Sequence, residues 1–496
     1  MRPIATTSSP SVAGRGGRGL VRDGIVYGIA ITLQRGLSFL LLPAATRVMS
    51  QTEFGVASAG LAVAGLLSMI FSFGISFAIV RLYYDEPEDA ERTEWAMLVR
   101  VQVILGVVLA AAVWASGPLW SRMFEGIGWA VSLQLAVVYG ALTAIQSTSL
   151  SVLRASRRPL AFTLASVVQI AVGGTLAIVL ARRDGAAGFF AGLAIGAGCS
   201  AFLGHVATYR RPAWSWRGTR GALLLSIPFV AHMLSQWVFN LSDRVLIERF
   251  LGLDELARYH VAYALGMAPM LILDASQAAW GPHYYGSLTS AQKKALPEAV
   301  VVPAAALVGL LTGILVAGAP VLAVLVAPDG FSVPVLVIAV VAATACVRTP
   351  YMLGFTALAD VKSSGPIARA SALAATLNLA LNVALVPRFG LNAAATTTLA
   401  SFALMSFIVV RRAERALDTN FRLGALAGTW SVVAVGLAGI ALVPDTSFGV
   451  AIRATIAIGL FPAVWAAGRV VRRRYRLVTN EGGAQQAAVD SPGGAL

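Results

Sequence analysis

The chain is a succession of apolar stretches of about 20 residues, the length that a helix needs to cross the hydrocarbon core of a bilayer. Short polar connections separate these stretches, and none of them is long enough to hold an extramembrane catalytic domain. We count fourteen expected spans, which begin near Gly24, Val56, Ala96, Trp129, Leu160, Ala186, Ala222, Tyr259, Val300, Val335, Ile367, Leu391, Leu423 and Val450. The pattern therefore predicts an all-α polytopic membrane protein.

Composition indicates the same class of protein. Hydrophobic residues make up 57% of the 496 residues, charged residues make up only 12%, and the mean hydropathy is +0.77. A soluble globular protein usually has about a quarter of its residues charged. Because this chain has far fewer, it cannot cover a water-facing surface, and a soluble multidomain protein is excluded.

The formal net charge of +15 indicates an orientation in the membrane rather than a nucleic-acid partner. If the N-terminus is cytosolic, the cytosolic segments hold 26 of the 38 Lys and Arg residues, and the outside loops hold 8. Lys and Arg collect in the cytoplasmic loops of membrane proteins. We therefore expect both termini in the cytosol and no binding of nucleic acid.

Two pairs of similar segments indicate an internal repeat. Arg183-Asp-Gly-Ala-Ala-Gly resembles Arg388-Phe-Gly-Leu-Asn-Ala at an offset of 205 residues. Arg47-Val-Met-Ser, just before Phe54-Gly, resembles Arg249-Phe-Leu-Gly at an offset of 202 residues. Such an offset corresponds to six spans, an even number, so both halves have the same topology. In transporters, parallel repeats place the substrate between two lobes that rock against each other.

The repeat predicts two parallel six-helix lobes followed by two further helices. The expected units are a disordered cytosolic tail (1–22), an N-lobe (23–220), a C-lobe (221–412), the two C-terminal spans (413–476) and a second disordered cytosolic tail (477–496).

Arg35 is the deepest cation of the first span. A charged side chain near the middle of a bilayer is costly and normally faces a protein interior or a water-filled cavity. Small and polar residues share its helical face, at the spacing of Gly24, Gly28, Thr32 and Ser38. Arg35 therefore either lines a substrate cavity or bonds to a backbone carbonyl of a neighbouring helix.

Spans seven and eight carry the candidate coupling groups. His232, Gln236, Asn240 and Asp243 share one face of span seven, and Arg244 follows them. Asp243 and Arg244 form either a charge pair at the helix end or part of a site. His232 is either a satisfied interior side chain or a proton carrier. In span eight, Asp274 has no cation next to it in the sequence, which makes it the better candidate for binding a proton or a cation.

Spans ten to twelve carry further polar groups. Arg348 precedes Thr349-Pro350, so it either satisfies the carbonyl that the proline frees or faces Arg35 across the lobe interface. Asn378 and Asn382 share a face of span eleven. Such residues either line the cavity or hold helices together.

The chain has no arrangement typical of an enzyme. It lacks a P-loop, a nucleophile triad and a metal-ligand spacing, and its two cysteines, Cys199 and Cys346, lie inside apolar stretches. We therefore expect no catalysis, no metal and no cofactor. The expected cations outnumber the expected anions, and Arg is well suited to bind phosphate.

Several motifs resemble the Wzx-type polysaccharide and oligosaccharide flippases of the multidrug/oligosaccharidyl-lipid/polysaccharide (MOP) superfamily. The motifs are Leu42-Pro-Ala-Ala-Thr-Arg-Val-Met-Ser with Glu53-Phe-Gly, Phe73-Gly-Ile-Ser-Phe-Ala-Ile-Val-Arg81, Asn240-Leu-Ser-Asp-Arg244, Ala279-Trp-Gly-Pro282 and Asn378-Leu-Ala-Leu-Asn382 through Gly390. The resemblance covers nearly the whole chain and implies a MOP/MATE-like fold.

The resemblance also implies a function. It implies alternating-access transfer of an undecaprenyl-diphosphate-linked oligosaccharide repeat unit across a bacterial cytoplasmic (inner) membrane, for O-antigen, exopolysaccharide or capsule synthesis. By similarity, Arg35, Arg47, Arg81 and Arg244 would meet the diphosphate or the first sugar. A gradient of H+ or Na+ is the implied coupling, and polysaccharide polymerase machinery is the implied partner.

Four alternatives stay open from the sequence. A cation-coupled multidrug exporter of the same fold would favour acidic cavity groups, and a lipid II flippase would carry more arginines near the first span. A membrane glycosyltransferase or polymerase would need a longer outer loop with a catalytic base or metal site. A scaffold without transport would favour a uniformly apolar interior.

Overall fold

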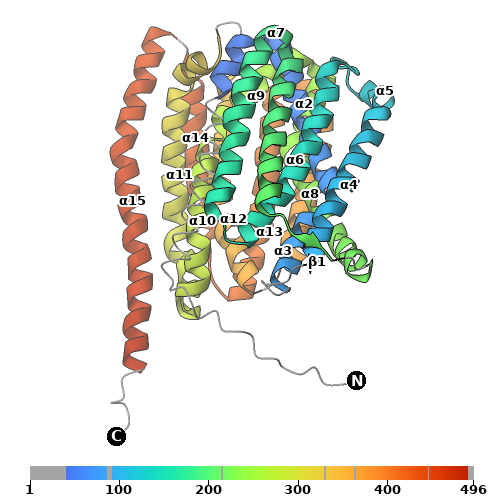
Figure 1. The fold of residues 1–496 in the computed structure, drawn as a ribbon. Helices are drawn as coiled ribbons and strands as arrows, with labels where there is room; N and C mark the ends of the chain where they lie inside the picture. Colours follow the sequence, from blue (N-terminus) through green and yellow to red (C-terminus); the bar gives the residue numbers. More distant parts are fainter. Residues whose placement is uncertain are drawn as a thin grey trace, which may run out of the picture.

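The computed structural model describes residues 41–85, 92–213, 216–328, 331–361, 363, 365–444 and 446–489, almost all of them in helices that stand side by side (Figure 1). The first half consists of a helical segment at 41–48, α2 (Gln51–Ser72), α3 (Ile75–Asp85), β1 (Arg92–Thr93), α4 (Glu94–Ala115), α5 (Gly117–Trp120), η1 (Ser121–Met123), α6 (Val131–Ala155), α7 (Pro159–Ala207) and β2 (Arg211–Pro212). The second half consists of α8 (Trp216–Leu251), α9 (Leu253–Gly266), α10 (Ala268–Ser287), α11 (Ser290–Val326), α12 (Val335–Asp360), α13 (Gly365–Leu417), α14 (Leu423–Ala441) and α15 (Ser447–Val489).

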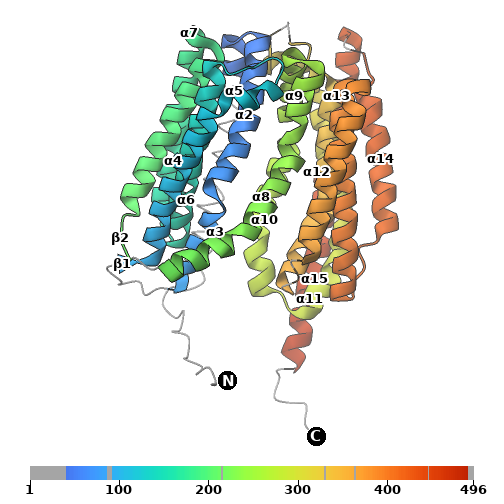
Figure 2. The ribbon, with the colours of Figure 1, turned by 90° about the vertical axis from the view of Figure 1, so that its right-hand side faces the viewer.

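The bundle has two ends, which we name for their composition and position. The basic end carries the connections at 156–158, 208–213, 288–289 and 418–422. Its cations include Arg157, Arg158, Arg210, Arg211 and Arg422 in these connections and Lys293 and Lys294 at the start of α11. The cap end carries α5, η1 and the short connection between α8 and α9. In Figure 2 the helices of the first half and those of the second half meet at the cap end and diverge toward the basic end, except for the start of α8, which crosses to lie beside α3.

The two longest helices are helical hairpins. α7 contains a left-handed glycine, Gly185 (φ 55°), and α13 contains another, Gly390 (φ 65°), where the chain turns back on itself. In α7, a Cβ added at Gly192 would lie 2.1 Å from the nitrogen of Ala177, and one added at Gly196 would lie 2.4 Å from the Cα of Gly173. Both contacts join residues at equal distances before and after the turn, as expected for two antiparallel helices. Gly185 and Gly390 are also 205 residues apart, so the repeat found in the sequence has a structural counterpart.

Close helix contact through glycine gives a first prediction. Gly192→Ala should lower the melting temperature of the detergent-solubilised protein, since overpacking a tight contact costs about 1–3 kcal/mol. The matched control is Gly198→Ala in the same half of α7, where the nearest atom to an added Cβ is Leu142 Cδ1 at 3.8 Å. That variant should melt at or slightly above the wild-type temperature, because Ala favours helix more than Gly does. Equal shifts for the two variants would contradict the hairpin.

Two pairs of successive helices meet at a break in the backbone. α2 is long and apolar enough to cross a membrane by itself, and α3 follows it after left-handed backbone at Phe73 (φ 47°) and Gly74 (φ 66°). α9 and α10 are bent by 43° where they join. Among the described residues, nine helices are long and apolar enough to cross a membrane, and counting the bent pair as one span makes ten. The all-α polytopic fold is thus confirmed. The number fourteen stays a prediction, because the first expected span lies mostly outside the described residues.

The apolar cores distinguish the two ends of the bundle. At the cap end one continuous core joins both halves and includes Phe54 and Leu133 from the first and Tyr259, Phe331 and Val386 from the second. Toward the basic end the cores are separate. One forms on α3 and α4 and is joined at its edge by Leu223, near the start of α8, and another forms among α8 and α10 to α14.

We use the names N-lobe for the helices up to residue 213 and C-lobe for α8 to α13. α14 and α15 pack against α11, outside the two lobes. Within the described residues the lobes therefore share a continuous core at the cap end. At the basic end their cores are separate, apart from the start of α8, where Leu223 packs at the edge of the α3–α4 core.

Candidate functional site

A charged pair lies near the middle of the C-lobe. Arg348 is 13 residues into α12, and its Nη2 lies 3.4 Å from Oδ1 of Asp274 in α10. Each side chain is 25% exposed, so the pair is neither sealed in the core nor fully solvated. Met270 and the ring of Phe402 form the apolar side of the Arg348 site.

This pair adds to two interpretations made from the sequence. Asp274 has no cation next to it in the sequence, but α12 supplies one in space, which sequence neighbours cannot reveal. The carbonyl that Pro350 frees belongs to Cys346, and it accepts a hydrogen bond from Trp430 Nε1 of α14 at 3.3 Å. Arg348 is therefore not needed to satisfy that carbonyl, and its charge is directed to Asp274 instead.

A second charged cluster lies about 10 Å from the cap end of α8, at 1.5 Å per residue over the seven residues to Leu251. Arg244 Nη1 lies 2.9 Å from Asp243 Oδ1, and both side chains are buried. The guanidinium carbon lies 4.4 Å from the ring centre of Tyr263, and Tyr259 donates a 2.5 Å hydrogen bond to Asp243 Oδ2. The two aromatic residues belong to α9, so the cluster joins α8 to α9. It is more than a charge pair at a helix end.

Asn378 and Asn382 occupy a different environment from the one expected for cavity residues. Both are buried within the α13 hairpin, where Asn382 Nδ2 donates to Asn378 Oδ1 at 3.0 Å. Thr397 donates to Asn382 Oδ1 at 2.7 Å, and Asn378 reaches Thr398 at 3.5 Å. In this conformation the two asparagines hold the two helices of the hairpin together, which is one of the two roles that the sequence had left open.

The cap end holds a set of contacts between the lobes. Thr52 Oγ1 donates to Asp254 Oδ1 at 2.7 Å, and a Cβ on Gly55 would lie 2.2 Å from the carbonyl oxygen of Leu253. Deeper in the bundle, Trp237 Nε1 of α8 donates to the carbonyl of Ala62 in α2 at 2.9 Å. Together with the shared core, these bonds close the cap end.

Arg47 belongs to this closure. Its exposed guanidinium donates to the carbonyls of Pro43 at 2.9 Å and Leu325 at 2.7 Å, near the C-terminus of α11. A cation is favourable at the C-terminus of a helix, where the backbone dipole is negative. Arg47 was expected to line the substrate cavity, but in this conformation it fastens the first helix to α11.

A carboxylate completes the closure. Glu248, near the end of α8, accepts a 2.7 Å hydrogen bond on Oε1 from the backbone nitrogen of Gly126 in the N-lobe. Beside it, Arg249 lies 2.6 Å from Glu125 across the same interface. These contacts were not predicted from the sequence. The internal repeat could have found it, because Thr52 and Asp254 are 202 residues apart and meet where the two halves of the repeat face each other.

The basic end is tied together within the C-lobe. Lys293 lies 2.9 Å from Asp360, and Arg422 lies 2.7 Å from Glu298. Lys294 also donates to Asp418, in the connection after α13, and its ammonium lowers the pKa of that exposed carboxyl. These pairs fix the end of α12 and the connection after α13 to α11.

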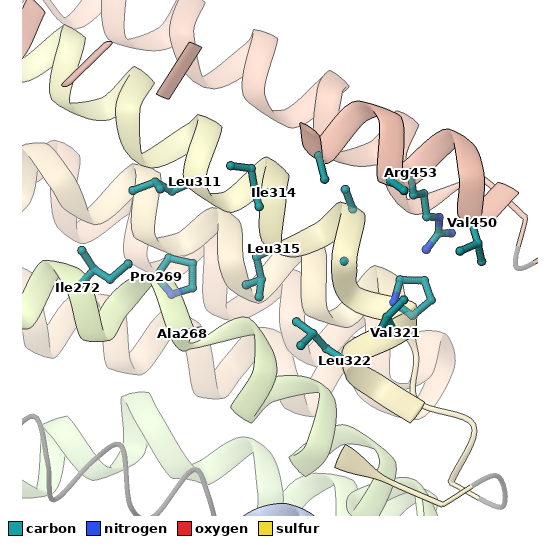
Figure 3. Close-up of a pocket in the computed structure, with 15 residues that line it drawn as sticks. Ala268, Pro269, Ile272, Leu311, Ile314, Leu315, Val321, Leu322, Val450 and Arg453 are labelled. Atoms are coloured by element: carbon teal, nitrogen blue, oxygen red, sulfur yellow. The ribbon is translucent and has the colours of Figure 1, made fainter. Parts of the chain in front are cut away.

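An apolar pocket lies on the outside of the C-lobe. It has a volume of about 510 Å³ and lies among α10, α11 and α15 (Figure 3). Ile272, Leu311, Leu315 and Val450 contribute to its walls, and Arg453 is the one charged residue of its lining. Such a lining suits a hydrocarbon chain better than a sugar.

Several predicted site residues cannot be placed. Arg35 lies outside the described residues. Arg81, His232, Gln236 and Asn240 lie in helices whose backbone is described, but their side chains lie outside that description. In the described part of the chain, no group of three His, Cys, Asp or Glu side chains is arranged to hold a metal ion.

The sequence and the fold of this chain are similar to those of known proteins. The model of the family described as polysaccharide biosynthesis protein matches residues 20–283. The probable low-salt glycan biosynthesis flippase Agl15 of Haloferax volcanii is 22% identical over 452 residues, which cover 89% of this chain and 93% of that protein.

Two solved structures share the fold. The lipid II flippase MurJ in an inward closed conformation has a TM-score of 0.63 and 14% identity, covering 89% of this chain and 98% of that one. An inward-facing MATE-family multidrug transporter of the MOP superfamily has a TM-score of 0.61 and 12% identity, covering 82% and 99%. Because the family match spans more than half of the residues and the helices have the arrangement of the MOP superfamily, the chain belongs to the polysaccharide biosynthesis protein family.

Proposed function

We propose that the protein is a flippase that moves a lipid-linked oligosaccharide from the cytosolic to the outer leaflet of a bacterial cytoplasmic membrane. The substrate is an undecaprenyl-diphosphate-linked repeat unit for polysaccharide synthesis. Membership of the polysaccharide biosynthesis family supports this assignment, and so does the name of the Haloferax relative as a glycan flippase.

The observation that carries the proposal is the unequal joining of the lobes. They share a core at the cap end and have separate cores at the basic end. With the Lys- and Arg-rich basic end in the cytosol, this is an inward-facing arrangement. A transporter that alternates access must break the cap-end contacts and join the lobes at the basic end instead.

The charged groups fit a phosphate better than a cation. Asp243 and Asp274 are each paired with an arginine, Arg244 and Arg348, so neither carboxylate is an isolated negative charge for a cationic drug. The Arg348 side chain is 25% exposed, so its guanidinium could exchange Asp274 for a phosphate oxygen. The apolar pocket beside α10 and α11 would hold part of the isoprenoid chain. Because both carboxylates are paired with arginines, the multidrug exporter is disfavoured.

Reconstitution tests the proposal. Purified protein in liposomes should move a fluorescent undecaprenyl-diphosphate oligosaccharide from the inner to the outer leaflet, as measured by the fraction that a membrane-impermeant quencher reaches. Vesicles without protein set the background. Efflux of a cationic dye by the same vesicles, without movement of the labelled lipid, would favour the drug exporter, and movement of lipid II alone would favour the lipid II flippase.

A further inference from the structure

Glu248 is a carboxyl group enclosed by the cap-end contacts. The residue is 1% exposed, and its Oε1 accepts the hydrogen bond from the backbone nitrogen of Gly126 in the other lobe. A Cβ on Gly126 would lie 2.8 Å from the Leu253 side chain and 3.3 Å from Glu248 Oε1, so the carboxyl is enclosed by atoms of both lobes. Opening the cap end would remove the Gly126 contact and admit water to Glu248.

The two oxygens of this carboxyl differ in their contacts. Oε2 is buried and has no hydrogen-bond partner among the described residues. Asp243 and Asp274, the acidic groups expected from the sequence to bind a coupling ion, each have an arginine instead. A buried carboxylate without full compensation is costly, and the neutral acid costs much less. Burial behind the closed cap therefore favours the protonated form of Glu248.

The two arginines near Glu248 on α8 are each paired with another carboxylate. On α8, Arg249 pairs with Glu125 at 2.6 Å, and Arg244 stacks on Tyr263 and pairs with Asp243. On α9, Asp254 is exposed and accepts from Thr52.

His260 of α9 is a further titratable group at the interface. Its ring packs edge-on against Phe54 of the N-lobe, with 5.4 Å between the ring centres, and its Nδ1 is buried without a hydrogen-bond partner among the described residues. Burial disfavours protonation of His260, because the protonated imidazole is charged. As the pH falls, His260 would therefore favour the open cap end, whereas Glu248 favours the closed one.

We propose that Glu248 is a proton-binding site whose occupation closes the cap end. The inference rests on the proposed alternating access and names a proton as the ion that stabilises the cap-closed state. The closed conformation binds the proton more tightly than the open one. By linkage, each unit of falling pH raises the ratio of closed to open protein, by up to about tenfold for one proton. Acid outside the membrane would then favour the inward-facing state.

The test measures the cap-end distance directly. Spin labels are attached at Asp184→Cys and Asn392→Cys, two exposed positions beside the hairpin turns of the two lobes, after Cys199 and Cys346 are replaced by Ala. Double electron–electron resonance in lipid nanodiscs then gives the closed fraction between about pH 8.5 and about pH 5, which covers ionised and protonated buried carboxyls. The labelled protein should close as the pH falls.

Glu248→Gln should stay at the acid-level closed fraction at every pH, because the amide keeps the shape of the neutral acid. Any change of the closed fraction with pH that remains in Glu248→Gln should have the opposite sign, because it would come from His260. This remaining change should disappear in the double variant of Glu248→Gln and His260→Gln. Asp418→Asn is the matched control, since this carboxylate is exposed and lies at the basic end, outside the cap-end contacts, and it should keep the wild-type response. If Glu248→Gln does not fold, Glu248→Met supplies a neutral side chain of similar length.

A wild-type closed fraction that does not change with pH would overturn the proposal, as would a Glu248→Gln protein that keeps the wild-type response. The measurement does not involve transport, so a failure of lipid flipping in the reconstituted system would leave this result unaffected and would count only against the proposed function.

Discussion

Arg348→Ala is expected to lower the rate of lipid flipping by at least about tenfold while the protein remains in the membrane. A charge-assisted hydrogen bond contributes about 1.5–3 kcal/mol, and about 1.4 kcal/mol corresponds to a factor of ten. The variant loses the guanidinium that we assign to phosphate, and it leaves Asp274 without the cation that now lies 3.4 Å away. The quencher assay in liposomes measures the rate, and fluorescence-detected gel filtration measures the amount of folded protein.

Three further variants separate the roles of this pair. Arg348→Lys keeps the charge but loses the planar fork that binds two oxygens, so an intermediate rate is expected. Asp274→Asn frees Arg348 and should keep flipping if Asp274 only positions the arginine. A collapse of flipping in Asp274→Asn would mean that Asp274 carries the coupling ion, as its sequence position first indicated. Wild-type flipping by Arg348→Ala would contradict the phosphate assignment.

Arg35→Ala is expected to have the same effect as Arg348→Ala, and this expectation rests on the sequence alone. Agreement between the two variants would place both cations on the same substrate path.

Periodicity and repetition in the sequence were sufficient to predict the architecture. Apolar stretches of a fixed length predict membrane helices because every backbone group must be satisfied inside hydrocarbon. The repeat was readable because the turn of each hairpin needs a left-handed residue, and glycine fills that position at Gly185 and at Gly390. The glycine that each turn requires is visible in the sequence. Because the two glycines are separated by six expected spans, their spacing predicts two halves of the same topology.

The side-chain pairing could not be predicted in the same way. Asp274 and Arg348 are 74 residues apart, and their distance depends on how α10 packs against α12. The same limit applied to Asn378 and Asn382, whose face on the helix was foreseeable while the hairpin partner on that face was not. Periodicity shows which residues share a face, but the neighbour of that face is set by tertiary packing.

Locking the cap end should stop transport altogether. Thr52→Cys and Asp254→Cys place two thiols where side-chain oxygens now lie 2.7 Å apart across the lobes. A short bifunctional methanethiosulfonate reagent should join them and hold α2 against α9. Because alternating access has to separate these helices, flipping should fall to the level of vesicles without protein and return when a reductant removes the link.

The matched control is a link within one lobe. Lys293→Cys and Asp360→Cys join α11 to α12 at the basic end, where the native side chains lie 2.9 Å apart in the C-lobe. This link should form under the same conditions and leave flipping unchanged, because rocking moves the lobe as a body. If the link between Thr52→Cys and Asp254→Cys formed fully and flipping continued, the lobes would not need to part at the cap end. The substrate would then have to cross by a route outside the interface, such as the lipid-facing side of α11 and α15.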